Sequence, residues 1–217
     1  METECRLCGS SSCSPIHCDN DNTLYHSCSV CGLVFMDVKS ILPAADEKSR
    51  YQLHDNTLDN KGYVKMLTGF LEKGVVPYLD QGASLLDFGS GPGPVLQTLL
   101  QRRGYDVDIY DPFFAPERVF AAKEYDGITA TEVLEHFSDP ASDIALLCSC
   151  LRTDGILAIR TEFLTDLAGF CNWWYRQDET HVAFYSSKTL RWIEENFPLK
   201  LLACRDGKIA VFRKHNR

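Results

Sequence analysis

Four cysteines near the start of the chain form two C-x-x-C pairs, a residue type and spacing that bind metals. The pairs are Cys5 with Cys8 and Cys28 with Cys31, and roughly 20 residues separate them, as in zinc ribbons and related knuckles. Four thiolates close a tetrahedron around zinc, so the spacing predicts a structural zinc site without a catalytic role. Two alternatives stay open. The cysteines are reduced and bind no metal, or one ligand is replaced by another side chain of this segment: Cys13, His17, Cys18 or His26.

A glycine-rich turn in the middle of the chain has the pattern of a nucleoside-binding site. The apolar run from Ala83 to Phe88 contains Asp87 and suits a buried strand, and Pro94 suits the first turn of a following helix. Between them lie three glycines, which let a backbone approach a ligand closely: Gly89, Gly91 and Gly93. The dinucleotide pattern G-x-G-x-x-G would need a glycine at position 94, which disfavours a nicotinamide-dependent oxidoreductase.

Acidic and histidine side chains follow two further predicted strands. The segment 105–111 alternates into Asp111, about 20 residues after the glycine turn, where a carboxylate can accept hydrogen bonds from both ribose hydroxyls. The segment 125–131 predicts a buried strand that leads to Glu132, Glu135 and His136. Open α/β sheets bind ligands at the carboxyl ends of their strands, which favours a site here. Glu135 is equally well explained as an acid at the start of a helix.

In this order the motifs resemble those of class I S-adenosylmethionine-dependent methyltransferases. The glycine turn is similar to the family's motif I, and Glu132-Val-Leu-Glu-His136 is similar to the segment after its fourth strand. With the paired cysteines, the Tyr51-x-x-His54-x-Asn56 segment and residues 174–185, nearly the whole chain resembles a bacterial group that carries an N-terminal zinc knuckle. The resemblance implies that S-adenosylmethionine is bound by Asp87, Gly89, Ser90, Gly91, Gly93, Asp111, Pro112, Phe113 and Glu132.

The expected fold is α/β, with a Rossmann-like, seven-stranded and mostly parallel sheet. Residues 1–40 are expected to form the zinc knuckle, 41–81 a helical connector or lid, and 82–217 the S-adenosylmethionine-binding domain. Apolar residues at helical spacing predict a helix over 61–79, and Asp206-Gly207 predicts a terminal hairpin. The segment between Asp111 and Tyr125 leaves little room for a full third strand. We therefore expect Phe113 or Phe114 to stack on part of the adenine.

Three histidines are candidate general bases for methyl transfer. His136 follows the predicted strand that ends near residue 131, and His181 lies in the aromatic block from Trp173 to Tyr185. A histidine of near-neutral pKa suits proton removal from a hydroxyl or an acidic carbon, although an isolated histidine is often structural. The resemblance adds His54 as the third candidate. The aromatic block is either the wall of a pocket for a ring-shaped acceptor or ordinary core, and the polar residues that interrupt it favour the pocket.

Composition restricts the class of partner and the compartment. A net charge of −8 and a pI near 5.2 argue against a broad nucleic-acid-binding surface. The sequence has neither a signal peptide nor an apolar run long enough to span a membrane, so we expect a cytoplasmic protein whose ten cysteines form no disulfides. The expected function is methyl transfer from S-adenosylmethionine to oxygen or carbon of a small molecule, such as a sugar or another ring-shaped compound. The alternatives are an RNA methyltransferase and a non-catalytic binding module on the same scaffold.

Overall fold

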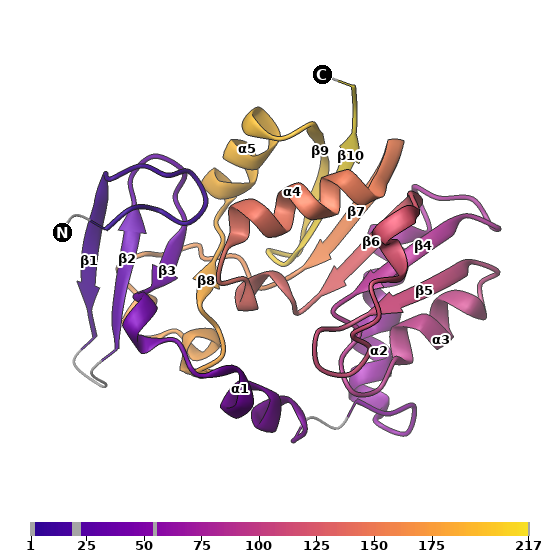
Figure 1. Ribbon diagram of the computed structural model, residues 1–217, viewed down its shortest axis with the longest axis horizontal. Helices are drawn as coiled ribbons and strands as arrows, with labels where there is room; N and C mark the ends of the chain where they lie inside the picture. The colour runs from indigo at the N-terminus through magenta and orange to yellow at the C-terminus, as the bar shows by residue number, and fades with distance from the viewer. Residues whose placement is uncertain (1–2, 19–22, 54–55, 217) are drawn as a thin grey trace.

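The main sheet is mixed and runs in the order β5-β4-β6-β7-β10-β9 in the computed structural model, which describes residues 3–18, 23–53 and 56–216 (Figure 1). The first four strands in this order are parallel, and β10 is antiparallel to both of its neighbours. Their bounds are β4 (Ser84–Phe88), β5 (Asp106–Tyr110), β6 (Tyr125–Thr131), β7 (Leu151–Arg160), β9 (Leu199–Arg205) and β10 (Ile209–Lys214). The α/β prediction is confirmed.

The described part of this sheet has six strands instead of the expected seven. The missing strand would lie between Asp111 and Tyr125, where the chain instead makes a short bridge between Asp111 and Ala115 and the 3-10 helix η3 (Val119–Ala122). Phe120, in this helix, is buried against the core. A further parallel strand here would need two crossover connections, one before it and one after it. Each such connection takes about a dozen residues, so the segment is too short for both of them and the strand.

Helices cover both faces of the main sheet. Alternate residues of each strand point to opposite faces, so Leu85 and Ile156 pack with α2 (Lys61–Phe70) and α3 (Val95–Gln101), whereas Leu86 and Leu157 pack with the other helices. Those helices are α4 (Pro140–Cys150), which Figure 1 shows in front of the sheet, and α5 (Ser187–Asn196). The helix expected over 61–79 is α2 followed by the π-helical turn η2 (Leu71–Val75).

A second, smaller antiparallel sheet lies at the N-terminal side of the molecule (Figure 1). It has the order β1-β2-β3-β8, and its last strand comes from far along the chain: Val34 pairs with Phe184. The strands are β1 (Cys13–His17), β2 (Leu24–Cys28), β3 (Val34–Met36) and β8 (Ala183–Phe184). The helix α1 (Ala44–Tyr51) then leads from this sheet toward the main one. The cysteine-bearing segment is therefore joined to the segment that carries His181.

One pair of cysteines contradicts the expectation that the chain forms no disulfides. Cys18, after β1, is bonded to Cys171 in the 3-10 helix η5 (Phe170–Asn172), with 5.3 Å between their Cα atoms. Both border a small apolar cluster around Phe170 and Phe184 that brings the two segments together. The other eight cysteines are free thiols. Within the described ranges, no helix is long and apolar enough to cross a membrane.

Candidate active site

The glycine turn after β4 is fixed by two close approaches. Gly89 has a φ of +80°, and a Cβ atom there would lie 2.3 Å from Cγ2 of Val133, so a larger residue cannot be accommodated. A Cβ at Gly93 would lie 2.0 Å from the backbone oxygen of Asn56. The close contact that requires a glycine at position 93 is thus made by this chain itself and not by a ligand. The turn is pressed between the segment after β6 and the segment after α1.

Asp111 connects the glycine turn to the turn after β5. Its Oδ2 accepts a hydrogen bond of 2.9 Å from the Gly91 N–H, and its Oδ1 accepts from the N–H groups of Phe113 and Phe114 at 2.9 and 3.0 Å. The side chain is almost fully buried. A carboxylate has about four lone-pair sites, so one remains available to a ligand beside these three donors.

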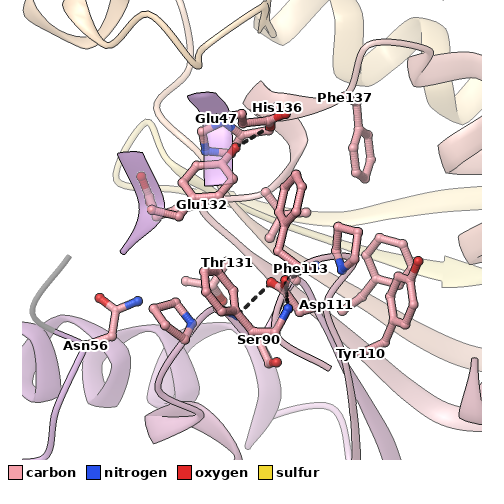
Figure 2. Close-up of a pocket in the computed structure, with 18 of the residues that line it drawn as sticks. Glu47, Asn56, Ser90, Tyr110, Asp111, Phe113, Thr131, Glu132, His136 and Phe137 are labelled. Carbon is pink, nitrogen blue, oxygen red and sulfur yellow. Dashed lines mark hydrogen bonds between the residues drawn. The ribbon is translucent and has the colours of Figure 1, made fainter. Parts of the chain in front are cut away.

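A cavity of about 450 Å³ opens beside this turn. Figure 2 shows Ser90 and Asp111 at one end of it and Glu47 and His136 at the other. Nine of the predicted site residues line it: Gly89, Ser90, Gly91, Asp111, Pro112, Phe113, Glu132, His136 and His181. Phe114 and Tyr51 add further aromatic surface. The fold thus brings together side chains that are widely separated in sequence.

Three predicted site residues are not seen at the cavity wall. Asp87 is buried beneath the turn, where its Oδ1 accepts a 2.9 Å hydrogen bond from the Thr129 hydroxyl. Burial raises the pKa of Asp87 to about 7. Gly93 packs on Asn56 and does not line the cavity. His54 lies outside the described residues.

His136 and His181 are neighbours at one end of the cavity, with ring centroids 4.9 Å apart. Nδ1 of His136 lies 2.9 Å from the Thr180 carbonyl oxygen, and Nδ1 of His181 lies 2.6 Å from that of Tyr175. A carbonyl oxygen can only accept, so each Nδ1 carries a hydrogen and each neutral ring keeps its basic lone pair on Nε2. Burial lowers the pKa of His181, which favours this neutral form.

Two glutamates lie behind the histidines and share one tyrosine. The Tyr175 hydroxyl lies 3.1 Å from Oε2 of Glu132 and is also hydrogen-bonded to Oε1 of Glu135. Glu132 is ion-paired with Arg160 and has a φ of 54°. Burial raises the pKa of Glu135, which is fully enclosed in the core. The alternative that Glu135 is simply an acid at the start of a helix therefore does not account for the hydrogen bond that its side chain accepts from Tyr175.

Most of the aromatic block from Trp173 to Tyr185 is core and not pocket wall. Phe184 and Tyr185 are fully buried, Trp174 is 64% exposed, and His181 alone among the described residues of this block lines the cavity. Tyr175 is also buried, but its hydroxyl reaches both glutamates. Sequence reasoning missed this contact, because the residues involved are about 40 positions apart.

The four cysteines of the two C-x-x-C pairs converge as predicted. The Sγ atoms of Cys5 and Cys31 are 3.5 Å apart, as are those of Cys8 and Cys28, and all four lie within 4.8 Å of one another. Zn–S bonds of about 2.3 Å in a tetrahedron place sulfurs about 3.8 Å apart, so the residues fit a zinc ion. The suggested substitutes Cys13, His17, Cys18 and His26 are outside this cluster. Cys18 is in the disulfide, and His26 Nε2 lies 3.0 Å from Asp37 Oδ2.

Arg6 connects the cysteine segment to the histidines, a role that sequence reasoning did not predict. Its guanidinium donates to the carbonyl oxygens of Met36, Ser138 (3.0 Å) and Val182 (3.2 Å). Ser138 and Val182 lie within two residues of the histidines. Arg6 is the one lysine or arginine between Cys5 and Cys31. Its guanidinium lies over the ring of Phe35, inside the protein, and is not presented to a nucleic-acid phosphate.

The cavity wall offers polar groups that a bound nucleoside could use. The hydroxyl oxygens of Ser90 and Thr131 are buried and have no hydrogen-bond partner in the part of the chain that the structure describes. Buried hydroxyls are normally paired, so two such atoms on one cavity wall fit a ligand that supplies the missing partners. Together with Asp111 and the apolar rings of Phe113 and Phe114, they suit the ribose and base of a nucleoside.

A mixed α/β sheet with a glycine turn after one strand and an acid after the next defines a Rossmann-like, nucleoside-binding class of protein. The sequence matches the methyltransferase domain family over residues 64–203, and the chain therefore belongs to this family of S-adenosylmethionine-dependent methyltransferases. No curated protein matches it significantly.

Solved methyltransferase structures share the fold at low sequence identity. An O-methyltransferase family protein from Burkholderia thailandensis superposes with a TM-score of 0.53 and 15% identity, covering 78% of this chain and 63% of its own. A methyltransferase of calicheamicin biosynthesis, bound to S-adenosylhomocysteine, superposes with a TM-score of 0.51 and 14% identity, covering 78% of this chain and 58% of its own. An S-adenosylmethionine-dependent methyltransferase from Archaeoglobus fulgidus superposes with a TM-score of 0.51 and 19% identity, covering 70% of this chain and 94% of its own. This chain thus spans less than two thirds of the length of the first two.

Proposed function

We propose that this enzyme transfers a methyl group from S-adenosylmethionine to the oxygen or carbon of a small-molecule acceptor, such as a sugar or another ring-shaped compound. The observation that carries the proposal is a single cavity with the glycine turn and Asp111 at one end and two adjacent histidines at the other. Cofactor and acceptor would each occupy one end. Methyl transfer is an in-line displacement, which needs this face-to-face arrangement.

The cofactor end is assigned to the glycine turn and the segments beside it. Asp111, Ser90 and Thr131 would pair with ribose and amino-acid groups, Phe113 and Pro112 would contact the base, and Glu132 would lie between cofactor and acceptor. Asp87 and Gly93 would act indirectly by shaping the turn. S-adenosylmethionine supplies a methyl group on a sulfonium, and the sulfur keeps the electron pair of the broken bond while the acceptor forms the new one.

At the acceptor end, a histidine would take the proton that the acceptor loses. His136 and His181 each hold Nδ1–H on a backbone carbonyl, so Nε2 is the basic nitrogen of both rings. Both rings line the cavity, so both are candidates for this role. The resemblance leaves His54 as a third candidate.

A structural zinc ion in the four-cysteine cluster completes the proposal. It would fix the segment that carries Arg6, whose hydrogen bonds reach the backbone beside both histidines. A segment of this size has too small a core to fold alone, and metal ligation supplies the missing stability. The zinc would thus affect the active site by holding this segment in place, without taking part in the reaction.

A cytoplasmic location is also part of the proposal.

RNA and pure scaffolding are less well supported. Within the described residues no lysine or arginine lines the cavity, whereas Glu47, Asp111, Glu132 and Asp143 do. Phosphate-rich acceptors need the opposite charge. An intact glycine turn with unpaired hydroxyls beside it also favours an enzyme over a scaffold.

The test is a transfer assay with S-adenosylmethionine that carries a labelled methyl group. Pools of sugars, phenols and other small hydroxyl compounds are compared with total RNA, using the wild-type protein and Asp111→Ala. The proposal predicts label in the small-molecule fraction only, and its loss in the variant. Label in RNA would contradict the proposed acceptor class, and S-adenosylhomocysteine binding without transfer to any pool would favour the scaffold.

A further inference from the structure

A carboxylate and two imidazoles meet at the acceptor end of the cavity. One ring nitrogen of His136, one of His181 and one carboxylate oxygen of Glu135 all lie within 4.8 Å of one another. Two histidines and one carboxylate are a frequent ligand set for divalent transition metals, and three protein ligands leave coordination positions open. Here the open positions would face the cavity, because both histidines line it.

The hydrogen bonds behind the two histidines are those that metal ligands make. Nδ1 of His136 donates to the Thr180 carbonyl and Nδ1 of His181 donates to that of Tyr175. A metal-bound histidine almost always donates its other ring N–H to a carbonyl or a carboxylate, which fixes its tautomer and orientation. Two adjacent rings with the same support are therefore prepared to present Nε2 to one ion.

Glu135 provides an independent observation. Its side chain is wholly buried, and Oε2 has no hydrogen-bond partner in the described part of the chain. Oε1 is held by the Tyr175 hydroxyl, so the carboxylate is oriented with one oxygen unsatisfied. Unpaired buried carboxylate oxygens are costly, and proteins normally compensate them with a hydrogen bond or a cation. A metal ion beside both histidines would supply that compensation.

We infer that Glu135, His136 and His181 bind a divalent first-row transition-metal ion, and that the methyl acceptor carries a hydroxyl group that binds to this ion. The inference rests on the proposed function and narrows the acceptor atom from oxygen or carbon to oxygen. The ion would favour ionisation of the hydroxyl, whose proton passes to water. The oxygen then forms its bond to the methyl carbon while the methyl–sulfur bond breaks, with the electron pair left on sulfur. The inference therefore keeps the proposed reaction but changes one role in it: the two histidines hold the ion, and water takes the proton that the general proposal gives to a histidine.

This metal site is chemically distinct from the four-cysteine cluster. Thiolates select zinc and other soft ions, whereas two imidazoles and a carboxylate also accept Mn²⁺. Protein whose cysteine cluster has been filled with zinc can therefore be titrated with Mn²⁺, and the free ion followed by electron paramagnetic resonance. The protein is loaded with one equivalent of Zn²⁺, which the four thiolates bind first. We then expect one Mn²⁺ per chain, with coupling to histidine nitrogen in the pulsed spectrum.

The variants Glu135→Gln, His136→Asn and His181→Asn should each weaken Mn²⁺ binding at least tenfold, as expected for loss of a ligand. Asp143→Asn is the matched control, because Asp143 is a cavity carboxylate outside the set, and it should bind Mn²⁺ like the wild type. Nitrogen coupling in the spectrum of the wild type tests whether histidine binds the Mn²⁺ ion, even if a variant fails to fold.

Three results would overturn the inference: no Mn²⁺ bound by the zinc-loaded protein, bound Mn²⁺ without nitrogen coupling, or wild-type affinity in the folded variants. Calorimetry with S-adenosylhomocysteine on the Mn²⁺-free protein separates this failure from that of the proposed function. Cofactor binding without Mn²⁺ binding rejects the metal site alone. Absence of cofactor binding rejects the methyltransferase proposal itself.

Discussion

The imidazole rings of His136 and His181 lie edge to face, with their centroids 4.9 Å apart. The Val182 N–H donates to the Glu135 carbonyl at 2.7 Å, which joins the two histidine segments, and Arg6 donates to Val182 and Ser138 from the cysteine-bearing segment. The N-terminal sheet adds β8, which pairs with β3 directly after Val182. The position of the histidine pair therefore depends on residues from three distant parts of the chain.

The histidine pair should be needed for turnover and not for cofactor binding. His136→Asn and His181→Asn are each expected to lower kcat roughly 100-fold or more, the usual loss when a group that assists proton removal is taken away. The affinity for S-adenosylhomocysteine should stay near that of the wild type. His17→Asn, which changes an exposed histidine, is the matched control. Unchanged turnover in both site variants would reject their role.

Loss of zinc should disturb the active site as well as the cysteine segment. Cys5 and Cys31 share an apolar core with α4 and α5, and Arg6 lies between Cys5 and Cys8. Chelation is therefore expected to expose residues 3–53 to protease first and to reduce turnover at the same time. Cys8→Ser should reproduce this effect and Cys204→Ser, at an exposed free thiol, should not. Normal proteolysis and turnover after verified zinc loss would contradict the structural role.

The bond between Cys18 and Cys171 should contribute to stability only in oxidised protein. It closes a loop with a sequence separation of 153 residues, and native disulfides typically contribute about 2–4 kcal/mol. Cys18→Ser and Cys171→Ser are expected to lower the free energy of unfolding by roughly this amount without reductant, and to match the wild type with reductant present. Urea titration measures both. Equal stability under oxidising conditions, with Cys18 and Cys171 both open to alkylation in the wild type, would show that the bond does not form.

Asp87 should make stability fall as the pH rises. Burial raises its pKa to about 7, so between its unfolded value near 3.9 and that pH the folded state binds more protons than the unfolded state. The free energy of unfolding of the wild type relative to Asp87→Asn should therefore decrease from about pH 5 to pH 7, by at most about 1.4 kcal/mol per pH unit. Above the folded pKa the difference should be constant. A difference independent of pH over this range would show that Asp87 is not buried as described.

Local patterns were sufficient for the strands and helices that carry their own periodicity. The run that ends at Phe88 became β4, and Asp206 and Gly207 became the central residues of the turn between β9 and β10, both with positive φ as in a type I′ turn. The cysteine cluster was also readable, because its four ligands come as two short-range pairs. In each of these cases the information lies within a few adjacent residues.

The remaining features depend on contacts between distant segments. β8 has two residues and exists because it pairs with β3, and β1 contains Pro15 and alternates weakly. Disulfide connectivity does not follow from cysteine positions, so Cys18 with Cys171 was not predictable. Arg6 contacts Ser138 across 132 residues, which no local pattern encodes. The seventh strand was expected from the family resemblance, although the short segment after Asp111 argues against it.

The central claim is that the cavity beside the glycine turn binds the methyl donor. Calorimetric titration with S-adenosylhomocysteine tests it most directly, comparing the wild type with Asp111→Ala, which removes the carboxylate that holds Gly91, Phe113 and Phe114. Hydrogen bonds to a charged group contribute about 1.5–3 kcal/mol, so the variant should bind at least tenfold more weakly. We predict micromolar binding to the wild type and this loss in the variant. No binding to folded, zinc-loaded wild-type protein, or equal binding to both, would contradict the account.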